Sequence, residues 1–178
     1  CAGFIGFHLS KRLIEKKIKV IGLDNVDNYY SKILKKKRIN ILKKSKRFEF
    51  VKIDIGNYGK LKKLLIKKNI ETIIHLAAQP GVRISIKKPH NTLKQNLIPF
   101  INILELARIK KVKKFIYASS SSVYGDTKIF PFNEKDIKNV PVSVYGASKL
   151  SNEVLARSYS ENFKLQSVGL RFFTVYGP

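Results

Sequence analysis

Tyr145 and Lys149 are four residues apart in the segment YGASK, and no other pair in the chain is better suited to chemistry. On a helix this spacing places both side chains on one face, about one turn apart. A tyrosine hydroxyl, with an ordinary pKa of about 10, is a poor base near neutral pH, but a nearby ammonium and a bound pyridinium both favour the phenolate. The pair therefore predicts a general base, Tyr145, activated by Lys149. An exposed helix pair in a lysine-rich protein is the alternative.

A run of hydroxyls precedes this pair in SSSSVYG, residues 119–125. The run follows a predicted strand, so the hydroxyls would lie at the end of that strand. There they could share the proton of a substrate alcohol with Tyr145. Serines in a loop also often cap or turn the chain without any other role.

The chain begins with CAGFIG, in which Gly3 and Gly6 lead directly into a predicted helix. This pattern is typical of the last two glycines of a nucleotide-binding loop, where the backbone approaches a pyrophosphate at a helix N-terminus. Asp24 follows about 20 residues later, where an acid accepts hydrogen bonds from an adenosine ribose. Its carboxylate would repel a 2′-phosphate, which favours NAD over NADP. An ordinary tight turn is the alternative for the glycines.

Hydrophobic periodicity predicts an alternation of strands and helices that positions these motifs. Strands are expected at residues 19–23, 48–53, 72–76, 114–119 and 166–172, and helices at 4–16, 32–42, 58–67, 91–109 and 144–162. Pro99 should kink its helix or lie near the start. The alternation predicts an α/β fold with a doubly wound, Rossmann-like parallel sheet, which binds ligands at the carboxyl ends of its strands.

Other polar side chains follow the predicted strands. Asp54 and the small residues Ala77 and Ala78 should lie at the cofactor edge of the sheet. A strand-end cap is the alternative for Asp54, and close packing is the alternative for the alanines. Arg83 is expected in a glycine-containing loop, either reaching a phosphate or lying on the surface.

Composition excludes several classes of protein. The 178 residues are 44% hydrophobic, which suffices for a packed core, and the single cysteine excludes a disulfide scaffold or a zinc site built on several thiolates. His8, His75 and His90 have no metal-ligand spacing, so no metal is expected. Neither a signal peptide nor a membrane span is visible, so we expect a cytoplasmic location.

The formal net charge of +24 would ordinarily suggest nucleic acid or another anionic partner. Lysine far outnumbers arginine, however, and is spread over predicted helix surfaces, which is typical of proteins encoded by A- and T-rich sequences. We therefore expect a solvated surface and no nucleic-acid partner. The densest basic run, residues 32–47, leaves open a non-catalytic nucleic-acid-binding domain on the same scaffold.

Together the motifs resemble those of the extended short-chain dehydrogenase/reductase family of nucleotide-sugar epimerases and dehydratases. They are GxxG, Asp24, Asp54, HLAA at 75–78, SSSSVYG, YGASK and LRFFTVYGP at 170–178, so the resemblance spans essentially the whole chain. The longer phrases at 23–39, 75–90, 117–125 and 169–178 are most similar to the UDP-glucuronate 4-epimerases of that family.

The resemblance implies roles for individual residues. Tyr145 would be the base, Lys149 would bind the nicotinamide ribose, and Ser120 would hydrogen-bond the sugar O4. NAD would be lined by Gly3, Phe4, Ile5, Gly6, Asp24, Asn25, Asp54, Ile55, Leu76, Ala77, Ala78, Gln79, Asn96, Ala118, Tyr145, Lys149 and Phe172. The UDP-sugar substrate would be bound by Arg83, Ser120, Ser121, Ser122, Tyr145 and Thr174.

The implied reaction is 4-epimerisation of a UDP-sugar through a 4-keto intermediate, with UDP-glucuronate converted to UDP-galacturonate. Related dehydratases and decarboxylases usually carry an acid just before VYG, where this chain has Ser121 and Ser122. Thr174 departs from the Asn common in UDP-glucose 4-epimerases, the nearest rival. UDP-glucose 4-epimerase and related dehydratase or decarboxylase activities remain the alternatives.

The chain contains no methionine, which indicates a processed start or a fragment. By the resemblance, residues 1–178 are an NAD-binding Rossmann-like domain truncated at both ends. It would lack its first strand and the C-terminal substrate domain. The full-length protein is expected to be a homodimer.

Overall fold

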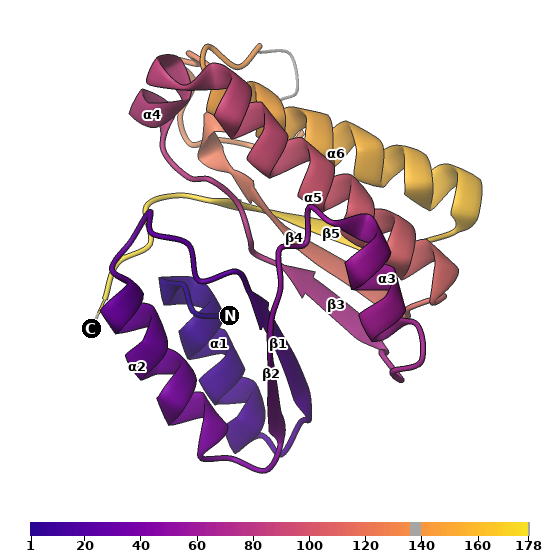
Figure 1. The fold of residues 1–178 in the computed structure, drawn as a ribbon. Coiled ribbons are helices and arrows are strands. Elements are labelled where there is room, and N and C mark those ends of the chain that lie inside the picture. Colours follow the sequence, from indigo (N-terminus) through magenta and orange to yellow (C-terminus); the bar gives the residue numbers. More distant parts are fainter. Residues whose placement is uncertain (136–139, 178) are drawn as a thin grey trace. The chain divides into compact units, whose positions relative to one another are not determined.

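The computed structural model describes residues 1–135 and 140–177, with strands and helices alternating along the chain (Figure 1). Pro178, the last residue of the LRFFTVYGP motif, lies outside the described residues. The chain forms two compact units, Cys1–Leu61 and Lys62–Pro178, and each is described by itself. Helix α3, Tyr58–Leu65, spans the boundary between them.

The first unit contains α1 (Phe4–Glu15), β1 (Val20–Asp24), α2 (Lys32–Lys43) and β2 (Phe48–Lys52). The two strands are parallel, with Val20 opposite Phe48 and Asp24 opposite Lys52. Phe7 of α1, Leu42 of α2 and Phe48 of β2 form the core of this unit. Because both strands run in one direction, the loops after Asp24 and Lys52 leave the same edge of this sheet.

Local chemistry accounts for these elements. The hydroxyl of Ser31 accepts a 3.3 Å hydrogen bond from the backbone N–H of Leu34 and so caps α2. Gly22 is required at the middle of β1, because a Cβ there would lie 2.6 Å from the ring of Phe48. The sequence therefore lets β1 and the aromatic core approach closely.

The second unit contains a three-stranded parallel sheet in the order β3-β4-β5. Its strands are β3 (Thr72–His75), β4 (Lys114–Ser120) and β5 (Ser167–Phe172), with His75 opposite Tyr117 and Ser120 opposite Phe172. Its helices are α4 (Val82–Lys87), α5 (Pro89–Ile109), the 3₁₀ helix η1 (Ser121–Tyr124) and α6 (Val144–Phe163).

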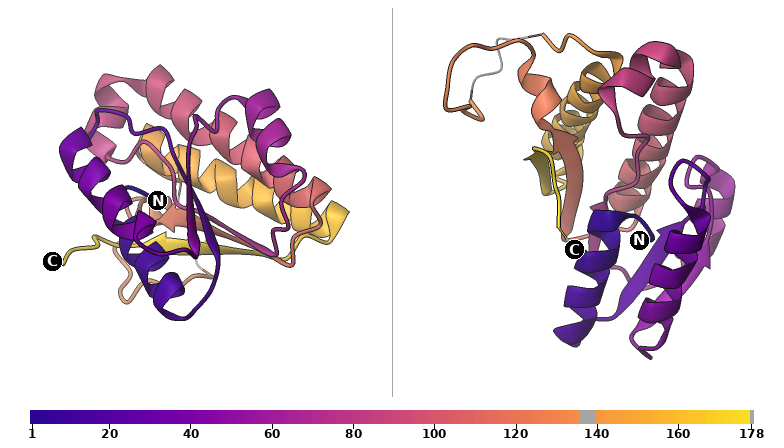
Figure 2. Two further views of the ribbon diagram at one scale, coloured as in Figure 1. Left: turned by 60° about the horizontal axis from the view of Figure 1, so that its bottom comes forward. Right: turned by 90° about the vertical axis from the view of Figure 1, so that its left-hand side faces the viewer.

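Helices α5 and α6 pack side by side along much of their length (Figure 1, Figure 2). The core beside α5 is aromatic: Phe100 is fully buried and contacts the rings of His75, Phe115 and Tyr117 edge to face. This packing connects α5 to β3 and β4, and it fixes the strand ends that carry the candidate catalytic residues.

The predicted α/β fold with parallel strands is confirmed, and all ten expected elements are present within a few residues of their predicted bounds. Two elements were not predicted, α4 and η1. Pro99 lies inside α5, which continues through it, so of the two alternatives expected for Pro99, a position near the helix start is excluded. Among the described residues, no helix is both long and apolar enough to cross a membrane.

Candidate active site

The glycine loop of the first unit ends at Gly3, which precedes α1 in an extended conformation. No side chain caps this helix and its first turn has no acidic residue. A Cβ at Gly3 would meet nothing within 4 Å, whereas one at Gly6 would lie 3.1 Å from the Cα of Cys1. Gly6 is thus needed for the close approach of the loop, and the N-terminus of α1 has the open space and N–H donors that suit a phosphate.

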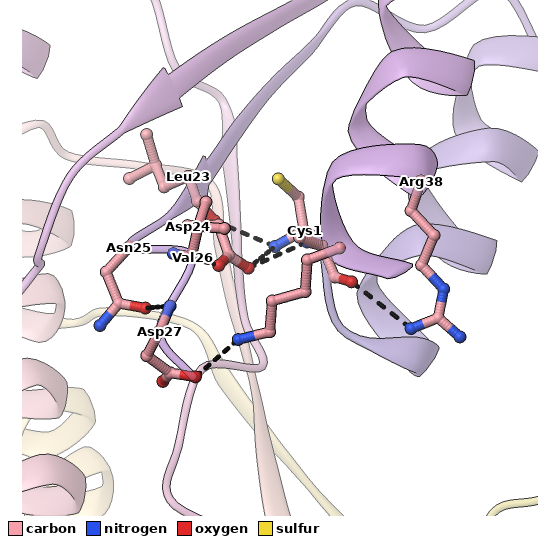
Figure 3. A network of polar contacts seen from close by, with 9 residues as sticks. Cys1, Leu23, Asp24, Asn25, Val26, Asp27 and Arg38 are labelled. Carbon is pink, nitrogen blue, oxygen red and sulfur yellow. Dashed lines mark hydrogen bonds and ion pairs between the residues drawn. The ribbon is translucent and has the colours of Figure 1, made fainter. Parts of the chain in front are cut away.

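Asp24, the last residue of β1, ties the glycine loop to the strand end (Figure 3). One carboxylate oxygen accepts the backbone N–H of Ala2 at 2.9 Å, and the other accepts that of Val26 at 2.8 Å. The backbone nitrogen of Cys1 donates to the carbonyl of Leu23 at 2.9 Å. Burial raises the pKa of Asp24, whereas the two backbone N–H donors lower it by stabilising the carboxylate.

Two basic side chains of α2 also reach this region, and Arg38 is labelled in Figure 3. The ammonium of Lys35 donates to Asp27 at 2.7 Å, and the guanidinium of Arg38 lies 3.5 Å from the carbonyl oxygen of Ala2. Lys35 is buried, which the expectation of a solvated basic surface did not foresee. The sequence signal for their common location is the spacing of three residues within the run 32–47, because this spacing places both side chains on one face of the helix.

Asp54 lies two residues beyond the end of β2, at Lys52, rather than at the strand end itself. Its side chain accepts the N–H of Gly56 at 2.8 Å, and its carbonyl accepts that of Asn57 at 3.1 Å. Asp54 therefore shapes a turn that also contains Ile55. A contact of either residue with a cofactor stays a prediction.

In the second unit, Tyr145 and Lys149 lie in the first two turns of α6, which begins at Val144 and is capped by the Ser143 hydroxyl. The ammonium of Lys149 donates to the carbonyl of Ala118 at 3.0 Å and lies 5.8 Å from the centre of the Tyr145 ring. Lys149 is 2% exposed, and this burial lowers its pKa to about 8. An ammonium has three N–H donors, and the Ala118 bond uses one.

Ser120 is the last residue of β4 and is buried. Its hydroxyl accepts the N–H of Ser122 at 3.2 Å and lies 3.2 Å from the Ser122 hydroxyl. Ser121 and Ser122 begin η1, so the serine run is not an irregular loop. Ser120 thus caps η1, and its hydroxyl lies at the strand end where sequence reasoning placed it.

A polar network not foreseen from the sequence supports the first turn of α6. The amide of Asn96, 1% exposed, accepts the N–H of Gln79 at 2.7 Å and donates to the Ser148 hydroxyl at 3.0 Å. The Ser148 hydroxyl donates to the carbonyl of Tyr145 at 2.7 Å, and the N–H of Tyr145 donates to the Ser85 hydroxyl at 3.1 Å. The side chain of Asn96 is therefore committed to protein partners that fix the backbone of Tyr145.

Arg83 lies in α4, so its expected position in a loop is wrong; the loop ends at Gly81, and the helix begins at Val82. Leu76, Ala77 and Ala78 follow β3, Phe172 ends β5 opposite Ser120, and Thr174 is exposed two residues further on. These residues leave the strands at one edge of the sheet, because all three strands are parallel.

His75 is buried at the end of β3. Burial, with the nearby charge of Lys149, lowers its pKa to about 3, so the imidazole is neutral at physiological pH. Within the part of the chain that the structure describes, no group of three or more His, Cys, Asp or Glu side chains could hold a metal ion.

Known proteins match the chain throughout. The family described as GDP-mannose 4,6 dehydratase matches residues 1–178. A probable UDP-glucuronate 4-epimerase of Rhizobium meliloti is 42% identical over 177 residues, which cover 99% of this chain and 52% of that protein. The chain therefore spans about half the length of such relatives.

The solved structures that share the fold include two UDP-sugar 4-epimerases. UDP-glucuronic acid 4-epimerase from Bacillus cereus, crystallised with UDP-glucuronic acid and NAD, is 38% identical with a TM-score of 0.88, over 99% of this chain and 55% of that one. UDP-glucose 4-epimerase from Thermotoga maritima, crystallised with UDP-glucose, is 32% identical with a TM-score of 0.88, over 99% of this chain and 54% of that one. The Rossmann-like fold and the resemblance expected from the motifs are confirmed. The chain belongs to the GDP-mannose 4,6-dehydratase family of short-chain dehydrogenase/reductase epimerases and dehydratases.

Proposed function

We propose that the full-length protein carrying this chain is an NAD-dependent UDP-sugar 4-epimerase that interconverts UDP-glucuronate and UDP-galacturonate. The observation that carries the proposal is the placement of Lys149, buried and 5.8 Å from the ring of Tyr145, on the helix that follows the Ser120 strand. The relatives named above support the same reaction class.

In this proposal Tyr145 takes the proton of the sugar 4-hydroxyl. The positive charge of Lys149 favours the phenolate over the phenol, which makes Tyr145 a usable base near neutral pH. Ser120 shares the hydrogen bond of the sugar O4 through its hydroxyl, which the cap of η1 holds in one orientation. Tyr145 returns the proton after the sugar has turned over in the site.

The residues present fit NAD. The uncapped N-terminus of α1 with open space at Gly3 suits the pyrophosphate, and the carboxylate of Asp24 suits the adenosine ribose. Lys149 keeps N–H donors beyond the Ala118 bond for the nicotinamide ribose. When bound, NAD accepts the hydride from sugar C4 and returns it to the opposite face. The remaining NAD contacts expected from the sequence stay part of this proposal, as does the assignment of residues 1–178 to one NAD-binding domain.

The choice of a uronate rests on neutral hydroxyls near Ser120. A 4-keto uronate is a β-keto acid that readily loses CO2, so a site that binds its carboxylate by neutral hydroxyls protects it. Ser121, Ser122 and Thr174 provide such donors, and no acid lies between Ser120 and the VYG motif. Elimination chemistry that needs an acid at that position is therefore disfavoured.

Purified full-length protein tests the proposal directly. We expect it to interconvert UDP-glucuronate and UDP-galacturonate, followed by chromatography of the nucleotide sugars. Interconversion of UDP-glucose and UDP-galactose alone would instead favour the activity named for the Thermotoga maritima structure. Release of CO2 would indicate a decarboxylase, and a stable 4-keto-6-deoxy product would indicate a dehydratase.

The homodimer expected from the resemblance is also proposed here, with α5 and α6 as the contact. These adjacent helices expose apolar side chains, among them Ile98 and Ile101 on α5 and Val154 on α6. Light scattering of the full-length protein checks the assembly. A monomer at micromolar concentration would contradict it.

A further inference from the structure

Glu153 and Arg171 form a largely buried, bidentate ion pair. Neither residue is among the candidate catalytic, cofactor-binding or substrate-binding residues. The Nε atom of Arg171 donates to one oxygen of Glu153 at 3.0 Å, and Nη2 donates to the other at 2.8 Å. The side chain of Arg171 is only 13% exposed and that of Glu153 only 17%. Such paired hydrogen bonds fix the relative orientation of two groups more strictly than a single charge contact does.

The pair joins five segments of the second unit. Glu153 comes from α6 and Arg171 from β5, and Glu153 also accepts the hydroxyl of Ser119, next to Ser120 in β4. The guanidinium of Arg171 lies 4.8 Å from the centre of the Tyr124 ring, at the end of η1. Its Nη1 atom donates to the carbonyl of Glu134 at 3.2 Å.

The ion pair thus links two groups of candidate catalytic residues: Tyr145 and Lys149 on α6, and Ser120 at the end of β4. Glu153 lies four residues after Lys149 and eight after Tyr145 on α6, so the three share one helix face. Ser119, which contacts Glu153, precedes Ser120 in the chain, and Tyr124, which contacts Arg171, follows it. Neither Glu153 nor Arg171 is proposed to contact the substrate or the cofactor. Any influence of the pair on the reaction would therefore act through the positions of Ser120, Tyr145 and Lys149.

We propose that Glu153 and Arg171 are positioning residues that hold the Ser120 hydroxyl at its working distance from Tyr145 and Lys149. The inference rests on the proposed function, because it assigns the pair a role in that reaction. A buried ion pair is by itself weak evidence for stability, since apolar side chains of similar size often replace one without loss. We therefore assign the Glu153–Arg171 pair a role in orienting neighbouring residues rather than in stabilising the fold. Displacement of a reacting group by about 1 Å lowers a rate about 100-fold.

The substitution Glu153→Gln in the full-length protein tests this inference. The amide keeps the shape of the carboxylate but loses the charge and one acceptor. We expect kcat with UDP-glucuronate to fall about 10- to 100-fold, with KM changed less than about twofold. The matched control is Glu105→Gln, which breaks a similar pair with Arg108 (2.6 and 2.8 Å) on α5 and should leave kcat unchanged.

A second readout needs no catalysis. Hydrogen exchange of residues 119–125 should be faster in Glu153→Gln than in the parent and unchanged in Glu105→Gln. If Glu153→Gln does not fold, Arg171→Lys keeps the charge, loses the two-pronged geometry and should show the same two effects.

The outcomes separate this inference from the proposed function. A parent without epimerase activity contradicts the proposed function, and the exchange result then decides whether the pair positions the serine segment. Unchanged kcat, or a lower melting temperature with unchanged exchange, overturns the positioning role.

Discussion

The ammonium of Lys149 lies 5.8 Å from the centre of the Tyr145 ring and is held at 3.0 Å by the carbonyl of Ala118. The strand that ends in Ser120 therefore sets the position of the charge that acts on Tyr145. Because the contact runs from helix to strand, the packing of α6 on β4 fixes the proposed base and the charge proposed to activate it.

Replacing Tyr145 with Phe should abolish turnover and preserve NAD binding, because the substitution removes only the hydroxyl that takes the proton. Turnover is followed by product chromatography, and bound NAD is released and quantified. Tyr159→Phe is the control: Tyr159 lies on the same helix, and its hydroxyl donates to Glu105 at 3.2 Å. Substantial residual activity in Tyr145→Phe would sink the assignment of the base.

Lys149 should make stability depend on pH in the alkaline range. Its pKa is about 8 in the folded chain against an ordinary value of 10.5, so the unfolded chain binds more protons between these pH values. The free energy of unfolding should therefore rise with pH in this window, by about 3 kcal/mol in total relative to Lys149→Met. Urea unfolding of both proteins without cofactor measures the difference. Parallel curves from pH 8 to 10.5 would contradict it.

His75 should make the stability of the fold depend on pH in the acid range. Burial lowers its pKa to about 3 from an ordinary 6.5, so the unfolded chain binds the extra proton in this window and stability is lost as the pH falls through it. The free energy of unfolding should fall more steeply for the parent than for His75→Phe, by up to about 1.4 kcal/mol per pH unit.

Asp24→Asn should weaken NAD binding about tenfold and reduce the preference for NAD over NADP. The amide loses an acceptor for the Ala2 or Val26 N–H and no longer repels a 2′-phosphate. Calorimetric titration with both cofactors measures the ratio of affinities. Glu15→Gln, at an exposed pair with Arg12, controls for the loss of one negative charge. An unchanged ratio would refute the role of Asp24 in cofactor choice.

Ser122→Asp should raise KM for UDP-glucuronate about tenfold more than KM for UDP-glucose, because two like charges at close range repel. The neutral hydroxyl of Ser122 lies 3.2 Å from that of Ser120, so the new carboxylate would lie near the proposed sugar site. Steady-state kinetics with both substrates distinguishes charge repulsion from general damage. Equal changes in both KM values would argue against a uronate site here.

The sequence predicts those features that depend on local spacing. Tyr145 and Lys149 are four residues apart, so helical periodicity alone places them together. Asn96 is different, because its partners Gln79 and Ser148 are 17 and 52 residues away and only the folded chain brings them to it. The helix α4 has six residues, too few for a periodic signal, and its Ser85 is identified only by its bond to Tyr145.

The roles of charged side chains likewise depend on contacts between residues that are far apart in the sequence. Lys35 and Arg38 are indistinguishable by composition from their basic neighbours, yet Lys35 is buried against Asp27 and Arg38 reaches the glycine loop. Arg171 is likewise one arginine in a strand until Glu153, 18 residues earlier, is placed beside it. Tertiary partners, not residue type, separate these side chains from the solvated lysines.

The contact between Lys149 and Ala118 also has a consequence for mutational tolerance. The acceptor is a main-chain carbonyl, which every amino acid carries, so no substitution at position 118 can delete it. Only a change at position 149 removes the bond outright. The anchor of the Lys149 ammonium thus depends on the identity of one residue rather than two.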